Sequence, residues 1–133
     1  MRRWRGPLGL LFVCLGGLVL LSRRLDAVEV RGGSMRPTLE PGDRLLVWRS
    51  AGAPRAGDVV VIADPTRAGH ELVKRVAEVS PAGVSVAGDN PSASTDSRIF
   101  GLVPSGRVRW RVVARYWPLD AIGRVPRPRR RSR

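Results

Sequence analysis

The sequence predicts an all-β fold, a compact curled antiparallel sheet, preceded by one apolar N-terminal helix. Short runs rich in valine alternate with turn signals made of Gly, Pro and Asp, which is typical of successive short strands. After Leu25 no long stretch has the apolar period of an amphipathic helix. We expect strands at 45–48, 59–63, 72–79, 84–87 and 108–116.

The first 25 residues are expected to form a membrane anchor. An apolar run from Leu8 to Leu21 is shorter than the roughly 20 residues of a typical spanning helix. A cleaved signal peptide, an uncleaved anchor and a buried core helix are the three alternatives. No Ala-x-Ala-like cleavage site follows the run, and arginines flank both of its ends, which favours a single uncleaved anchor.

Charge next to the anchor suggests how the chain is placed. The two flanks carry nearly equal positive charge, with slightly more on the N-terminal side. The folded domain of this single-pass protein is therefore expected on the outer side of the plasma membrane. The difference in charge between the two flanks is small, so a domain on the cytoplasmic side of the membrane is the alternative orientation. The folded domain should span residues 26–120. The Pro/Arg-rich residues 121–133 should be disordered, because they can bury almost no apolar surface.

The overall charge of +13 and the isoelectric point near 11.8 point to a polyanionic partner, either nucleic acid or anionic membrane lipid. No nucleic-acid-binding motif accompanies the charge, so we expect lipid and no nucleic acid. Cys14 is the single cysteine and His70 the single histidine, which excludes an intramolecular disulfide and a multi-histidine metal site. We expect no metal and no cofactor, and the sequence does not indicate an oligomeric state.

Lys74 is the single lysine among 24 basic side chains. Arginine stays protonated in proteins, whereas a desolvated lysine can become neutral. In the strand expected here, Leu72, Lys74 and Val76 share one face, and an amine on an apolar face has a lowered pKa. The alternatives are an arginine-favouring genome that left one lysine by chance, and a lysine at a strand edge whose amine reaches water.

Two further segments are rich in small residues. Gly32 and Gly33 precede Ser34, so the backbone there can approach a substrate closely, and Pro37 stiffens the following turn. Gly-Gly-Ser is also common in ordinary loops. The second segment, 88–98, is dense in small hydrogen-bonding side chains and is otherwise a polar surface loop. Within it, the spacing of Asp96 and Arg98 suits an ion pair.

Taken together, these segments resemble signal peptidase I and the other serine/lysine membrane proteases of family S26. The resemblance rests on four blocks in the family's order: Ser-Met-x-Pro-Thr-Leu from Ser34, Gly-Asp-Val-Val from Gly57, Lys-Arg at Lys74, and Gly-Asp-Asn…Ser-x-Asp-Ser-Arg from Gly88. It covers most of 28–117. The Arg-Tyr-Trp-Pro ending and the small size are most similar to a compact actinobacterial branch, which includes the proteases that mature nickel-type superoxide dismutase.

The resemblance implies a role for each matching residue. Ser34 matches the nucleophile and Lys74 the general base, while Ser94 matches the serine that orients the lysine amine. Asp96 and Arg98 match a supporting ion pair. The family activity would be cleavage of precursor polypeptides after small residues. The residues that match the family's substrate pocket are Val30, Met35, Leu39, Leu72 and Val73.

One position departs from the family pattern. Some members have a serine two positions before the nucleophile, and its hydroxyl contributes to the oxyanion hole. Here that position is Gly32, so the hole is expected to rely on backbone N–H groups of Gly32 and Ser34. The interval between Lys74 and Gly88 is also too short for the large β-domain inserted in some relatives.

Other functions remain open at this stage. A hydrolase could use His70 as the base for Ser34, although His70 lies in an expected hairpin tip. A non-enzymatic basic module tethered to the membrane could bind nucleic acid or anionic lipid. If the chain is a protease, its substrate could be general signal peptides or one dedicated propeptide.

Overall fold

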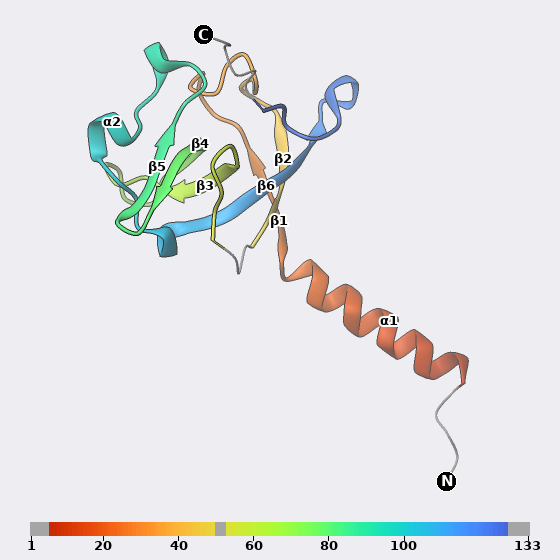
Figure 1. The fold of residues 1–133 in the computed structure, drawn as a ribbon. Helices are drawn as coiled ribbons and strands as arrows, with labels where there is room; N and C mark the ends of the chain where they lie inside the picture. Colours follow the sequence, from red (N-terminus) through yellow and green to blue (C-terminus); the bar gives the residue numbers. More distant parts are fainter. Residues whose placement is uncertain (1–5, 50–52, 128–133) are drawn as a thin grey trace.

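The computed structural model describes residues 6–49 and 53–127, which form one helix, α1, followed by a curled antiparallel sheet (Figure 1). The described strands and helices are α1 Pro7–Ser22, β1 Leu25–Glu29, β2 Arg44–Trp48, β3 Val59–Ala63, β4 Glu71–Ser80, β5 Gly83–Ala87, α2 Ser97–Phe100 and β6 Val108–Trp117, with short 3-10 turns at Pro91–Ala93, Ser105–Arg107 and Leu119–Ala121. The predicted all-β sheet with an N-terminal helix is confirmed.

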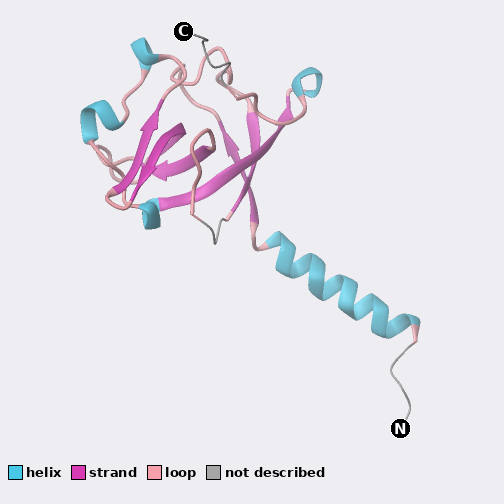
Figure 2. Ribbon diagram, viewed as in Figure 1, coloured by secondary structure: helices cyan, strands magenta, loops and turns pink. Residues whose placement is uncertain are grey.

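The six strands form one open sheet in the order β1-β2-β6-β3-β4-β5, with every neighbouring pair antiparallel. The last strand in the chain, β6, is therefore inserted between β2 and β3. Figure 2 shows β6 as the long strand that crosses the middle of the domain. The register shifts where β6 pairs with β2 and again where it pairs with β3. Bulges of this kind bend a strand and increase its twist, and so help to curl the sheet.

All five expected strands are present, and their ends lie within one residue of the expected ones. The sequence does not predict the strand β1. Its residues, Leu25–Glu29, are half-buried or exposed and include two acids, so no apolar run marks them. This segment is a strand because all five of its residues pair with β2, which is a tertiary effect.

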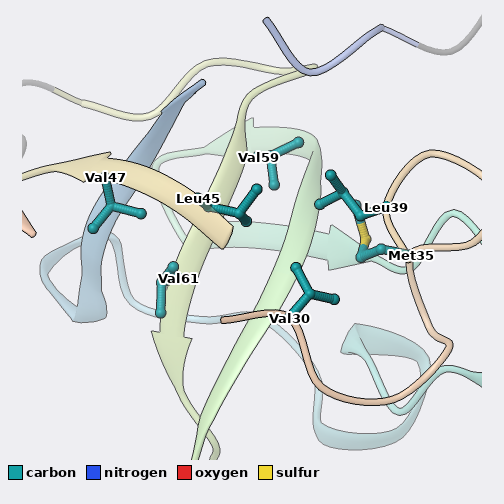
Figure 3. Packing of buried hydrophobic residues seen from close by; sticks show 7 residues of the cluster. All are labelled: Val30, Met35, Leu39, Leu45, Val47, Val59 and Val61. Carbon is teal, nitrogen blue, oxygen red and sulfur yellow. The ribbon is translucent and has the colours of Figure 1, made fainter. Parts of the chain in front are cut away.

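Two apolar clusters fill the two sides of the sheet. β3 explains why there are two: Val59 and Val61 belong to one cluster, and Val60 and Ile62 belong to the other. A strand buried on both faces reads as a continuous apolar run, as Val59–Ala63 does. The first cluster lies beside the loop that follows β1 (Figure 3) and contains Val30, Met35, Leu39, Leu45, Val47, Val59 and Val61.

The residues after β6 return along the sheet. Backbone hydrogen bonds pair Gly123 with Arg115, and Val125 packs against the first cluster. These positions belong to the segment 121–133 that we expected to be disordered. Its residues 121–127 are placed on the domain, and 128–133 lie outside the described residues.

The helix α1 extends away from the sheet, as Figure 1 shows, and none of its side chains is buried. Its sixteen residues include several exposed leucines, among them Leu8, Leu10 and Leu18. Within residues 6–49 and 53–127, the structure contains no helix with the length and hydrophobicity required for a membrane span. The N-terminal arginines of the expected anchor, at positions 2, 3 and 5, lie outside the described residues.

Replacement of Leu45 tests the first cluster. Leu45 is fully buried on β2, so Leu45→Ala should lower the free energy of unfolding by about 2–5 kcal/mol through lost burial and the cavity left behind. Leu119→Ala is the control, because Leu119 is 69% exposed. Urea unfolding followed by circular dichroism measures both. Equal effects of the two substitutions would contradict this packing.

Candidate active site

Lys74 lies on β4 with its side chain in the apolar interior. It pairs across the sheet with Val60 and shares its face with Leu72 and Val76, which belong to or pack against the second apolar cluster. Only 2% of Lys74 is exposed. Burial is the largest influence on the pKa of Lys74 and lowers it, and the positive charge of Arg98 acts in the same direction. Asp96 and Asp64 oppose the shift, but the pKa of Lys74 stays below its ordinary value.

The Lys74 amine donates a hydrogen bond to the hydroxyl of Ser94, with 3.0 Å between Nζ and Oγ. That hydroxyl in turn donates to Oδ2 of Asp96, also at 3.0 Å. Because the Ser94 proton is committed to the carboxylate, the Ser94 oxygen presents its lone pairs to the lysine. The order of donors therefore fixes the direction in which the amine points.

Asp96 anchors this chain of hydrogen bonds. It is 1% exposed and caps the N-terminus of α2 by accepting from the backbone N–H of Arg98. The Arg98 side chain pairs with the same carboxylate, with 2.9 Å between Nε and Oδ1, and the Gly88 N–H donates to Oδ2 at 3.3 Å. Burial alone would raise the pKa of Asp96, but the hydrogen bonds from Arg98, Gly88 and Ser94 outweigh it and hold this pKa far below its usual range.

Ser34 lies in the loop between β1 and β2, and residues that follow β5 hold this loop in place. The backbone N–H of Asn90 donates to the Ser34 carbonyl at 2.8 Å, and the Asn90 side-chain amide donates to the Gly33 carbonyl at 3.1 Å. Gly88 lies where the two segments meet. A Cβ atom on Gly88 would lie 2.6 Å from the Ser34 carbonyl oxygen and 2.3 Å from Ser94 Oγ.

Gly88 thus lies between the backbone of Ser34 and the side chain of Ser94, which binds the Lys74 amine. Within residues 6–49 and 53–127, no hydrogen bond joins the Ser34 hydroxyl to the Lys74 amine, whose observed partner is Ser94. Gly32 precedes Ser34 with a φ of +73°, a conformation that favours glycine, and no atom lies within 4 Å of the place where a Cβ would be. The backbone before Ser34 is therefore open to an approaching group.

Ser34 is among the residues that line a groove of about 450 Å³. Four of the five residues expected to form a substrate pocket line it, namely Val30, Met35, Leu72 and Val73. The fifth, Leu39, is fully buried in the first apolar cluster and does not line the groove. His70 also lines the groove with an exposed side chain.

Two free strand edges border this groove. β1 is the first strand of the sheet and pairs only with β2, so its other edge has no strand partner in the described sheet. In β4, residues 71–74 pair with β3, while pairing with β5 starts at Arg75. The outer edge of 71–74 is therefore also free. An extended peptide could use the backbone groups of both edges.

The sequence reading missed a second ion pair that supports the site. Arg75, which follows Lys74, makes a bidentate contact with Asp89, with 2.9 Å from Nε to Oδ1 and 2.8 Å from Nη2 to Oδ2. The Thr38 hydroxyl donates to the same carboxylate. Burial would raise the pKa of Asp89, but the hydrogen bonds from Arg75 and Thr38 lower it. Arg75 and Asp89 both belong to motifs of the sequence, but only the fold shows that they pair.

No group of histidine, cysteine and acidic side chains suited to a metal ion occurs in the described part of the chain. The polar side chains of the site instead bind one another. The arrangement provides a buried amine bound to Ser94, beside the loop of Ser34, and Ser34 lines a groove of mixed polar and apolar side chains. It is suited to proton transfer from a hydroxyl to an amine.

Comparison with known proteins identifies the family of the chain. Residues 4–87 match the family model for signal peptidase, peptidase S26. The chain is 34% identical over 110 residues to mitochondrial inner membrane protease subunit 1 of Schizosaccharomyces pombe, covering 65% of this chain and 70% of that protein. It is 36% identical over 118 residues to mitochondrial ATP-independent inner membrane protease subunit 1b of Arabidopsis thaliana, covering 69% and 70%.

A bacterial relative, signal peptidase I of Leptolyngbya laminosa, is 26% identical over 171 residues, covering 90% of this chain and 84% of that protein. The family match ends at Ala87, immediately before the segment that contains Ser94 and Asp96. The match includes Ser34 and Lys74 and extends over more than half of the chain. The chain belongs to the S26 family of signal peptidases.

Proposed function

We propose that this protein is a membrane-associated serine endopeptidase in which Ser34 is the nucleophile and Lys74 the general base. The observation that carries the proposal is the buried Lys74 amine, held by Ser94 next to the loop of Ser34. A serine hydroxyl is a weak nucleophile until a base takes its proton, and serine–lysine pairs are one known solution. Burial lowers the pKa of Lys74 and so favours the neutral amine that this reaction requires.

The proposed reaction has two stages. In the first, neutral Lys74 accepts the hydroxyl proton of Ser34 while Oγ forms a bond to the peptide carbonyl carbon. The intermediate collapses with cleavage of the C–N bond, and the Lys74 ammonium returns the proton to the leaving amine. In the second, Lys74 takes a proton from water, which attacks the acyl ester, and Ser34 recovers its hydroxyl as the acid product leaves.

Backbone donors would stabilise the oxyanion in this scheme. The N–H groups of Gly32 and Ser34 are the proposed donors, since position 32 has no side-chain hydroxyl. A single donor to an oxyanion is typically worth about 3 kcal/mol in the transition state. Ser94, Asp96 and Arg98 act behind Lys74 as positioning residues, because their hydrogen bonds set the direction of the amine.

The substrate is proposed to be a precursor polypeptide that binds as an extended strand along the groove. The free edges of β1 and β4 offer backbone hydrogen bonds, and apolar side chains such as Leu72 and Val73 offer shallow contacts for small side chains. We further propose that residues 1–25 attach the enzyme to a membrane, because the leucines of α1 are exposed and relatives are named as inner membrane proteases.

Substitution of the two proposed reacting groups tests the mechanism. Detergent-solubilised protein should cleave a precursor with an Ala-x-Ala site, and Ser34→Ala and Lys74→Arg should each lower kcat by at least about a thousandfold. Lys74→Arg is informative because arginine keeps the positive charge but cannot become neutral. The control is Arg107→Lys, at an exposed position outside the groove.

The substrate panel separates the alternatives. It contains a general signal-peptide precursor and the propeptide of nickel-type superoxide dismutase. Cleavage of the second alone would identify a dedicated maturation protease. Retained cleavage in Lys74→Arg would contradict the proposed base. Salt-dependent binding of nucleic acid or anionic lipid, with no cleavage of either precursor, would favour a basic binding module.

Gly88→Ala tests the close approach inside the site. The new Cβ would overlap Ser94 Oγ and the Ser34 carbonyl, so one of these must move. A displacement of about 1 Å can reduce kcat by about a hundredfold. Gly106→Ala is the matched control, since nothing lies within 4 Å of its Cβ position. Steady-state cleavage and thermal unfolding should both be measured, and an unchanged kcat for Gly88→Ala would contradict this geometry.

The pH dependence tests the electrostatics around Lys74. Activity should rise with pH as Lys74 loses its proton. Asp96 raises the pKa of Lys74, so Asp96→Asn should lower this pKa further and move the rise in kcat to lower pH, with a reduced maximum because Ser94 loses its partner. Glu78→Gln removes an exposed charge from the same strand and serves as the control. A shift of the Asp96→Asn profile to higher pH would contradict the assignment.

A further inference from the structure

The residues after β6 form a strap across the domain, which we define as the C-terminal strap, residues 121–127. It is attached at four places. Ala121 and Pro126 use their carbonyl groups, Gly123 pairs with the backbone of Arg115, and Val125 packs on the first apolar cluster. In Figure 1 this segment returns from the end of β6 toward the loop that follows β1.

The first carbonyl contact involves Arg115, a largely buried residue of β6. Its Nε donates to the Ala121 carbonyl at 2.8 Å. Its Nη1 donates to the Thr38 carbonyl at 3.2 Å and to Oδ2 of Asp43 at 2.9 Å. One guanidinium thus joins the strap to the loop that contains Ser34.

The second carbonyl contact involves Arg75, whose side chain is 6% exposed. Its Nη2 donates to the Pro126 carbonyl at 2.9 Å and also to Asp89. Asp89 accepts the hydroxyl hydrogen bond of Thr38 at 2.6 Å. The far end of the strap is therefore joined to the same threonine through one arginine and one carboxylate.

Thr38 is bound on two sides, and the strap supplies a hydrogen-bond acceptor to the arginine on each side. Its carbonyl is bound by Arg115 and its hydroxyl by Asp89, and each arginine has a strap carbonyl among its acceptors. Arginine presents several donors in a rigid planar fork, so one guanidinium couples the position of the strap carbonyl to the positions of its other acceptors. Reorientation of either arginine would release one side of Thr38.

We propose that the C-terminal strap is a positioning element of the active site, which holds the loop 33–39 in place through Arg115 and Arg75. The effect of the strap on catalysis rests on the proposed function, whereas the structural coupling between the strap and the loop 33–39 does not. Arg115, Thr38 and the strap are positioning residues, because none of them lines the groove and each is joined to the loop directly or through Arg75 and Asp89. The strap has one apolar anchor on the core, Val125, which makes it separable from the strands it joins.

The experiment compares two full-length variants with the same chemical change. Val125→Asn places an amide on the apolar cluster, whereas Leu119→Asn alters a residue that precedes the strap and is 69% exposed. Hydrogen–deuterium exchange is followed in the segment 33–40, which contains the Leu39 N–H bonded to the Met35 carbonyl. Steady-state kcat and KM are measured on the same samples, well below the unfolding temperature.

Val125→Asn should accelerate exchange in 33–40 and lower kcat about tenfold or more, with a much smaller change in KM, because a displaced nucleophile slows chemistry more than binding. Leu119→Asn should leave both near the wild-type values. A general loss of stability would instead accelerate exchange across all strands alike. Faster exchange in the strap alone, with 33–40 unchanged, would overturn the proposal.

Two further results keep the proposals separate. If the wild type cleaves no precursor while Val125→Asn still accelerates exchange in 33–40, the proposed function fails and the coupling stands. If Val125→Asn does not fold, Arg115→Lys replaces it, since lysine keeps the charge beside Asp43 but cannot reach Ala121 and Thr38 with one rigid fork. Faster exchange in 33–40 is again expected, with Arg107→Lys as the control, and unchanged exchange would overturn the coupling.

Discussion

The burial of one amine is the constraint on which the site depends. Lys74 is almost completely removed from water, and an unpaired ammonium there would be costly. The structure meets this cost with an ordered chain in which Lys74 donates to Ser94 and Ser94 donates to Asp96. Asp96 is itself buried, and it stays charged because Arg98 and backbone N–H groups bind it. The polar network therefore gives the buried amine a hydrogen-bond partner and sets its orientation.

Backbone contacts extend this order to the loop of Ser34. Asn90 binds the carbonyl groups of Gly33 and Ser34, and Gly88 permits an approach that a side chain would block. The segment that follows β5 thus holds both sides of the site, the amine through Ser94 and Asp96 and the serine loop through Asn90. A site assembled from rigid segments in this way can keep reacting groups within the small tolerances that catalysis requires.

The fold explains how so short a chain can build such a site. Insertion of β6 between β2 and β3 makes one curled sheet with an apolar cluster on each side. The curl leaves the free edge of β1 and the free edge of residues 71–74 as borders of one groove. After β6, the strap closes one side of the domain and completes the contacts of Arg115 and Arg75. The same few strands therefore supply the core, the groove and the support of the loop.

The sequence alone determined the fold class, five of the six strands and the family, because apolar runs, turn residues and motif order are local signals. It also singled out Lys74 and Ser94, which the structure joins by a hydrogen bond. Only the tertiary structure revealed β1, which is a strand through its pairing with β2, and the Arg75–Asp89–Thr38 contact. The strap at 121–127 was also hidden, because its attachment uses backbone carbonyls and one valine. Contacts between distant residues leave no periodic pattern, so they become visible only when the chain is folded.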